Sequence, residues 1–276
     1  MAFSGDGQNK DTNPKNLLPK GLKLAFSQAA DDKRINVFFD PDVKAKVDPS
    51  KYITKRKEGV FKDSIASGCV AFLEDDNKDV VMLAVAYQVC MNDNHAPQSQ
   101  HDYTEMATAM SRLRDYHNAD LVIAALTMKE WWLSPPNKMI MASVDCDNKA
   151  AQRIAPALDW ERVADPATVE SLFYPVYKTA VDETGQNRDI PLPPQAEKDR
   201  VWFYACADKA IIKQAKILLQ LMDAGGVTNK KTNHTIPVDF SALAQIGLTR
   251  ARLEAVARGD LSRKHLNSVP QKPPVP

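Results

Sequence analysis

Cysteine is scarce in this 276-residue sequence. The four cysteines stand far apart, without a Cys-x-x-Cys pair or a histidine at ligand spacing, so neither a zinc site nor a disulfide framework is predicted. Long apolar runs are missing too, since none reaches the length that crosses a bilayer, and the polar N-terminus does not have the pattern of a signal peptide. We therefore expect reduced cysteines, no metal, no membrane association and a cytoplasmic location.

An excess of charge of one sign is also missing. The chain has 36 basic and 35 acidic residues, a net charge of +1. This balance excludes a global field that would attract nucleic acid or acidic membranes, so any such binding has to be local. What the sequence does have is apolar residues, at 44%. A chain of this length and composition buries a core, and we expect one main domain with a smaller one.

Glycine is absent from a long central stretch, between Gly68 and Gly185, and three prolines gather soon after it. Pro191, Pro193 and Pro194 stiffen a segment that we predict to be a linker. The composition predicts four segments: a flexible N-terminal segment at 1–33, a main α/β domain at 34–180, a Pro-rich linker at 181–199, and a helical C-terminal unit with a Pro-rich tail at 200–276.

A hairpin is predicted at residues 69–74 and 80–90, two apolar, β-rich runs joined by a short Asp/Asn turn. The second run is apolar almost throughout, which predicts a strand buried on both faces in the middle of a sheet. Elsewhere the pattern predicts a short helix at 22–30, a strand at 34–39, last strands at 161–165 and 172–179, a long helix at 201–222, and two short helices within 239–259.

The centre of the chain has the pattern of strand, loop, helix, strand and helix. These five elements are predicted at 101–111, 112–118, 119–132, 139–144 and 148–158. The loop at 112–118 is polar and basic and leads into a helix that two strands flank. Free backbone N–H groups and the helix dipole favour an anion at such a helix start, so a phosphate-bearing cofactor is predicted there.

This central stretch resembles the GCN5-related N-acetyltransferase (GNAT) superfamily, in which a motif of Arg or Gln, two variable residues, Gly, one variable residue, and Gly or Ala wraps the pyrophosphate of acyl-coenzyme A. Residues 114–119 (Arg-Asp-Tyr-His-Asn-Ala) match the first and last positions, with His117 at the usual first glycine. A second signature is an Asn after the next strand, followed by a helix that ends in Gly-Phe. Five residues keep its spacing: Asn148, Ala151, Ile154, Leu158 and Trp160. The resemblance covers residues 68 to about 177.

The resemblance implies an α/β (α+β) fold with a GNAT-like mixed, mostly antiparallel sheet flanked by helices. It implies an N-acyltransferase that moves an acyl group, usually acetyl, from acetyl-CoA or another acyl-CoA to an amine, on a small molecule or a protein, by direct attack on the thioester. Glu105 is implied as the base, because the amine must be neutral to attack. The implied cofactor-binding residues are Met106, Thr108, Arg112, Arg114, His117, Asn118, Ala119 and Asn148.

Single residues in this set have alternative explanations. Glu105 is equally a solvated carboxylate at a strand edge, and strict alternation predicts that Met106 and Thr108 share the opposite face of its strand. Asn148 either reaches the pantetheine arm or caps the helix that follows it. Cys146 lacks a His and acid partner in the sequence, so a structural thiol is favoured over a nucleophile.

Departures from the family pattern leave two other hypotheses open. Ala155 stands where the family usually has a Tyr that reprotonates the leaving thiolate, and the loop lacks glycine. A catalytically inactive GNAT-like fold that serves as a protein interaction module is the second hypothesis. The third is that the basic C-terminal helices bind nucleic acid, although such charge is usually a solvated surface. Residues 246–250 (Ile-Gly-Leu-Thr-Arg) resemble the ending of a family of short bacterial proteins and, more loosely, a helix-turn-helix. A homodimer is also left open.

Overall fold

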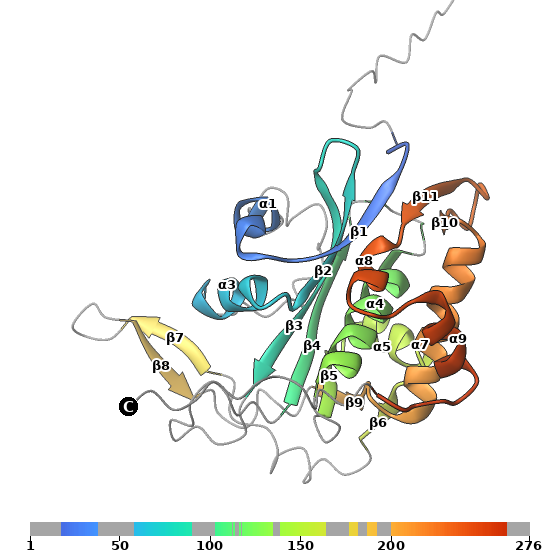
Figure 1. The fold of residues 1–276 in the computed structure, drawn as a ribbon. Helices are drawn as coiled ribbons and strands as arrows, with labels where there is room; N and C mark the ends of the chain where they lie inside the picture. The colour runs from blue at the N-terminus through green and yellow to red at the C-terminus, as the bar shows by residue number, and fades with distance from the viewer. Residues whose placement is uncertain are drawn as a thin grey trace, which may run out of the picture.

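The computed structural model describes residues 18–37, 58–89, 103–111, 113, 116, 118–134, 139–163, 177–181, 187–191 and 200–263, and every structural statement below concerns these residues. They form a nine-stranded sheet and a two-stranded hairpin, with helices on both faces of the large sheet (Figure 1). No helix among them combines the length and the apolar character that a membrane span requires.

The large sheet is mixed and mostly antiparallel, so the predicted fold class is confirmed. Its strand order is β10-β11-β1-β2-β3-β4-β5-β9-β6. Only β1–β11 and β4–β5 are parallel, and all other neighbouring pairs are antiparallel. The strands are β1 (Leu22–Phe26), β2 (Val70–Asp75), β3 (Val80–Val89), β4 (Tyr103–Ser111), β5 (Met139–Asp145), β6 (Glu161–Arg162), β9 (Arg200–Tyr204), β10 (Gly226–Thr228) and β11 (Thr235–Asp239). The separate hairpin pairs β7 (Tyr177–Val181) with β8 (Asn187–Pro191).

Helices cover the two faces of the sheet unequally. One face carries the short 3-10 helix η2 (Ala29–Asp31), α1 (Asp32–Asn36) and α3 (Glu58–Ala66). The other carries α4 (Asn118–Leu133), α5 (Lys149–Ala157), α7 (Asp208–Asp223), α8 (Ser241–Gln245) and α9 (Arg250–Ala257) (Figure 1). Helix α4 lies in the middle of this thicker layer.

Two cores correspond to these two faces. The larger one joins the sheet to α4, α7, α8 and α9, and every residue from 121 to 132 of α4 is buried. The smaller one packs Ile35 of α1 and Ile65 of α3 against Phe72, Leu83 and Val85 of the sheet. Because β3 contributes side chains to both cores, it is buried on both faces, and this prediction is confirmed.

Three predicted elements are wrong near the chain ends. Residues 22–26 form β1 instead of a helix, because Leu22 and Leu24 alternate with the exposed Lys23 and pair with β2 and β11. Residues 32–36 form α1 instead of a strand. Residues 200–204 form β9, so the helix predicted at 201–222 begins only at Asp208.

Segments predicted to be flexible or helical contribute to the large sheet. Strand β1 lies between β11 and β2, and β9, β10 and β11 come from the part of the chain predicted to contain helices alone. Strand β8 lies in the predicted linker. The four-segment division of the chain stays a prediction about folding units, whereas the secondary structure assigned to its first and last segments is wrong in part.

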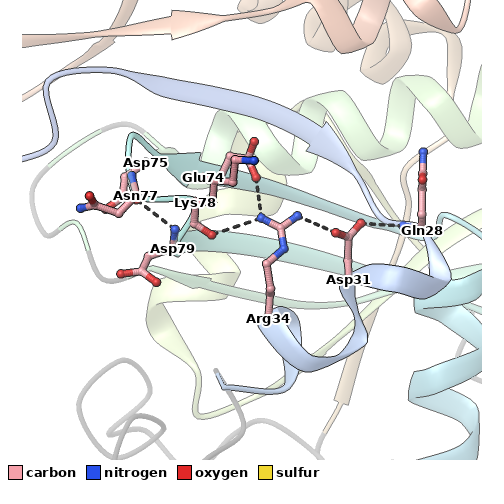
Figure 2. Close-up of polar contacts among 8 residues, drawn as sticks. All are labelled: Gln28, Asp31, Arg34, Glu74, Asp75, Asn77, Lys78 and Asp79. Atoms are coloured by element: carbon pink, nitrogen blue, oxygen red, sulfur yellow. Dashed lines mark hydrogen bonds and ion pairs between the residues drawn. The ribbon is translucent and has the colours of Figure 1, made fainter.

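Arg34 connects α1 to the β2–β3 hairpin. Its guanidinium donates to Asp31 Oδ1 at 2.5 Å, to Glu74 Oε2 at 2.6 Å and to the Lys78 carbonyl at 3.1 Å (Figure 2). It also lies over the Phe72 ring, 5.4 Å from the ring centroid. The hydrogen bonds to Asp31 and Glu74 raise the pKa of Arg34, so this cation stays charged and holds the helix against the sheet.

Candidate functional site

The large sheet opens between β4 and β5. The parallel ladder runs from Tyr103↔Met139 to Met106↔Ala142 and stops there. Beyond that point β4 stays paired with β3 as far as Ser111, and β5 stays paired with β9 as far as Asp145. Each strand therefore follows its outer neighbour, and the two diverge although both continue.

A β-bulge in β4 lies at the point of divergence. Ala86 pairs with Met106 and Val85 with Thr108, so Ala107 is the extra residue opposite β3. A bulge bends its strand and increases its twist, which explains why β4 leaves β5 here. The N–H and C=O groups of 107–111 that point toward β5 find no partner in that strand, so an extended ligand with amide groups can pair with them.

Helix α4 begins close to the end of β4 in the chain. Strand β4 ends at Ser111, and the helix starts at Asn118 and runs for 16 residues. The first N–H groups of a helix have no intrahelical acceptor, and the helix dipole places partial positive charge at this end. The sheet opening and the start of a helix therefore lie on consecutive elements of the chain, as an elongated ligand with an anionic end requires.

Two residues of the intervening loop are described, and both are anchored. Leu113 and Tyr116 are partly buried and pack against the larger core. Tyr116 also forms an isolated antiparallel bridge with Asn229, and its Oη is hydrogen-bonded to His234 Nδ1 at 3.1 Å. The predicted phosphate-binding residues Arg112, Arg114 and His117 lie outside the described residues.

The predicted base lies on β4 immediately before the strands diverge. The backbone of Glu105 pairs with Tyr87 of β3 and Met141 of β5, one residue ahead of the last β4–β5 pair. This position is next to the opening between β4 and β5. Its role as the base stays a prediction.

Of the predicted cofactor-binding residues on β4, Met106 has a side chain that is 6% exposed and belongs to the larger core. It can therefore contact a ligand only through its backbone. Thr108 follows the bulge, where the register shifts by one residue against β3. Asn118 and Ala119 are the first two residues of α4. Their binding roles stay predictions.

Asn148 is the N-cap of α5, as predicted for one of its two roles. Its Oδ1 accepts a hydrogen bond from the Ala151 N–H at 3.0 Å. The Gln152 amide donates to the Cys146 carbonyl, which fixes the turn between β5 and α5. Contact between Asn148 and a pantetheine arm stays a prediction.

Helix α5 ends in a left-handed residue, the conformation suited to the glycine of the Gly-Phe signature, but here that residue is Asp159. Asp159 has φ 55°, the left-handed conformation that glycine adopts most easily, and Trp160 N–H donates to the Ala155 carbonyl at 2.9 Å. Ala155 itself is fully buried against Val144 and Phe203. No hydroxyl is present at the position where the resemblance implied an acid.

Two arginines of the basic C-terminal helices, Arg250 and Arg252, are paired with carboxylates of the same chain. Arg250 is paired with Asp223 at 2.6 Å and with Glu254 at 3.0 Å. Arg252 is paired with Asp260 at 2.9 Å and lies over the Trp132 ring. Acidic partners neutralise both guanidinium groups, so less charge is left for phosphates.

Two parts of this site had no signal in the sequence. A bulge leaves no fixed pattern of residue types, so Ala107 could not be singled out. Tyr116 occupies a variable position of the loop motif, and its partner His234 lies over a hundred positions later. A search of the described residues for three or more clustered His, Cys, Asp or Glu side chains finds no metal-binding group.

No protein-family model matches the chain, and neither does any curated protein. Its fold is similar to that of yncA, a putative acetyltransferase from Salmonella typhimurium solved with acetyl-CoA, at 12% identity, with 67% of this chain and 92% of that chain covered and a TM-score of 0.38. It is similar to the diaminobutyrate acetyltransferase EctA from Paenibacillus lautus, at 11% identity, 67% and 94% coverage and a TM-score of 0.37. It is also similar to a mosquito arylalkylamine N-acetyltransferase like 5b, at 11% identity, with 67% of this chain and 98% of that chain covered and a TM-score of 0.40. Identities and scores this low carry no conclusion about activity, and we rest the function on the strand geometry of this chain.

Proposed function

We propose that this protein is an acyl-CoA-dependent N-acyltransferase that moves an acyl group, most simply acetyl, to an amine. One observation carries the proposal: β4 and β5 diverge at a bulge, immediately before the segment that leads to the start of α4. The amides of a pantetheine arm would pair with the unpaired backbone of β4, as an added strand does. The diphosphate would lie at the first N–H groups of α4.

The residues near the bulge supply the chemistry in this proposal. Backbone N–H groups of β4 at 106–108 would stabilise the negative charge that develops on the thioester oxygen. Glu105 would accept the proton of the amine, directly or through water. A thiolate is a good leaving group, so water suffices as the acid, although Ala155 offers no hydroxyl.

The proposal includes an amine acceptor, on a small molecule or a protein, and a cytoplasmic location. The free thiols at Cys69, Cys146 and Cys206 agree with a reducing compartment. EctA is described in complex with diaminobutyric acid and coenzyme A, and a plant Naa50 with a bisubstrate analogue of coenzyme A and a peptide. Amines of both sizes therefore belong in a screen, and a homodimer is tested by the mass in solution.

Calorimetric titration with acetyl-CoA tests the proposal first. We expect heat of binding and a higher melting temperature, because a ligand that binds only the folded state stabilises it. Thiol release with a panel of amines then tests turnover. Absence of both binding heat and thermal protection would remove the proposal.

Glu105→Gln tests the role of the base. We expect kcat to fall about a hundredfold or more at neutral pH, with the Kd for acetyl-CoA unchanged, since the amide cannot accept the proton. Glu161→Gln is the matched control, because Glu161 is an exposed carboxylate on β6. Equal activity in the two variants would show that Glu105 is not the base.

A catalytically inactive interaction module is the second candidate. The buried Ala155 in place of a hydroxyl, and a loop sequence without glycine, favour it. Coenzyme A binding without thiol release over the whole amine panel, or no coenzyme A binding at all, would support this candidate.

A further inference from the structure

The turn of the β10–β11 hairpin, residues 229–234, lies against the loop that precedes α4. Tyr116 forms its backbone bridge with Asn229, and its hydroxyl contacts His234 Nδ1 at 3.1 Å. The two rings meet edge to face, with centroids 6.4 Å apart and planes at 89°. Tyr116 therefore contacts this turn with its backbone, its hydroxyl group and its ring.

This turn is built as a fixed support. Asn229 Oδ1 accepts from the N–H groups of Lys231 and Thr232, at 2.9 and 3.0 Å, and the Asn229 N–H donates to the His234 carbonyl at 2.8 Å. The turn therefore keeps its shape through bonds that do not involve the loop.

The hairpin is also held to the body of the protein. Strand β11 is paired with β1, Leu22 opposite Val238. Gly226 of β10 lies so close to β11 that an added Cβ would stand 2.0 Å from the Ile236 carbonyl oxygen. A contact to this turn thus fixes the loop relative to the sheet.

The loop needs such a support more than usual. Residues 112–117 contain no glycine, so the backbone cannot reach a phosphate through glycine conformations. Leu113 and Tyr116, the two described residues of the loop, pack against the larger core. Binding a diphosphate with backbone donors gains affinity when the donors are held in place before the ligand arrives.

We propose that His234 and Asn229 hold Tyr116 and so preorganise the diphosphate-binding loop, which makes Tyr116 and His234 positioning residues for cofactor binding. This inference rests on the proposed function. In a loop that has no glycine, contacts with the β10–β11 hairpin thereby help to hold the backbone donors in the conformation that binds the diphosphate.

Tyr116→Phe and His234→Ala test the inference on the whole 276-residue chain. Tyr116→Phe keeps the ring and removes one hydrogen bond, so we expect the Kd for coenzyme A to rise about fivefold. The double variant should bind no more weakly than His234→Ala alone, because both changes remove the same contact. Transfer from S-acetylpantetheine, which lacks the diphosphate, should keep its wild-type rate in both variants.

Thr228→Val is the matched control. It removes the 2.9 Å hydrogen bond between the Thr228 and Thr235 hydroxyls in the strands of the same hairpin, and it changes no contact of Tyr116. We expect it to bind coenzyme A as the wild type does. Equal weakening by Thr228→Val, or equal loss of rate with S-acetylpantetheine, would show general loosening and overturn the inference. Wild-type affinity in Tyr116→Phe and His234→Ala would overturn it and leave the proposed function standing. A wild type that does not bind coenzyme A removes the proposed function itself.

Discussion

Arg34 illustrates how much one side chain does at the residue scale in this protein. It contacts two carboxylates, one carbonyl and one aromatic ring, and so ties a five-residue helix to a hairpin 40 positions away (Figure 2). A helix this short is not stable alone, so its place in the fold depends on such contacts.

We expect Arg34→Ala to lower the free energy of unfolding by about 1 kcal/mol, allowing for solvent screening of the ion pairs and loss of the contact with Phe72. Urea unfolding of the variant and the wild type measures this loss of free energy. Arg250→Ala is the matched control, since Arg250 also pairs with two carboxylates but is more exposed. We expect a clearly smaller loss there, and equal losses would show that the ring contact adds nothing.

Asp260 gives a residue-scale prediction for pH. Hydrogen bonds from the Ser262 hydroxyl and N–H, and then Arg252, hold the pKa of this carboxyl below its ordinary value. A carboxyl with a lowered pKa in the folded state stabilises the fold above its unfolded pKa, and this stabilisation is lost as pH falls through the lower folded value. The carboxyl resonance of Asp260 should therefore titrate at a lower pH in NMR spectra than the carboxyl of an unperturbed aspartate. Arg252→Gln should move that midpoint upward, and an unchanged midpoint would remove Arg252 as a cause.

At the scale of elements, the sequence predicted the central run well. Periodicity indicated β4, α4, β5 and α5 in order, and Asn148 was placed correctly at a helix start. Short segments at 22–26 and 200–204 were assigned wrongly, because a five-residue stretch carries little local preference and sheet partners far away in the sequence decide its conformation.

The bulge, and the residue at which β4 and β5 diverge, could not be predicted from residue patterns, and diverging strands were expected only from the resemblance to the acetyltransferase superfamily. Both are properties of register, and register depends on which residues of other strands lie opposite. The Tyr116–His234 contact joins two elements that only the folded sheet brings together. Of the candidate site, the sequence therefore predicted the order of elements and the helix cap, but not the bulge or the residue at which the strands diverge.

The β10–β11 hairpin offers an element-scale test with two adjacent glycines. Gly226→Ala places a Cβ 2.0 Å from the Ile236 carbonyl oxygen, so we expect a loss of about 3 kcal/mol in unfolding free energy. Gly225→Ala meets no neighbour within 4 Å and has only its φ of 71° to oppose it, so we expect about 1 kcal/mol. Thermal unfolding of both variants ranks them, and the reverse order would contradict the steric argument.

At the scale of the whole molecule, the C-terminal helices complete the core around α4. Helices α7 and α9 carry buried residues of the same core as the sheet, including Leu218 and Leu253. Helix α4 is buried along residues 121–132, nine of which are apolar, because it is covered from the sheet side and from the C-terminal side. The sequence indicated a separate C-terminal unit, and one shared core favours joint unfolding.

We therefore expect one unfolding transition, with far-ultraviolet circular dichroism and tryptophan fluorescence coinciding. Leu253→Ala should move the whole transition, with a loss of about 3 kcal/mol, because it leaves a cavity in the shared core. Leu133→Ala is the control, at a side chain that is 40% exposed, and should cost less than about 0.5 kcal/mol. Two separate transitions would instead support the predicted boundary at 181–199.

The parallel pairing of β1 with β11 also bears on how the protein is made. Leu22 and Lys23 are synthesised 216 residues before their partners Val238 and Asp239. Until then the nascent chain has an open strand edge at β1, which other chains in the cell can join. Contacts so far apart in sequence also slow folding. Fast expression at high temperature should therefore give aggregates, and slow expression in the cold should raise the yield of native protein.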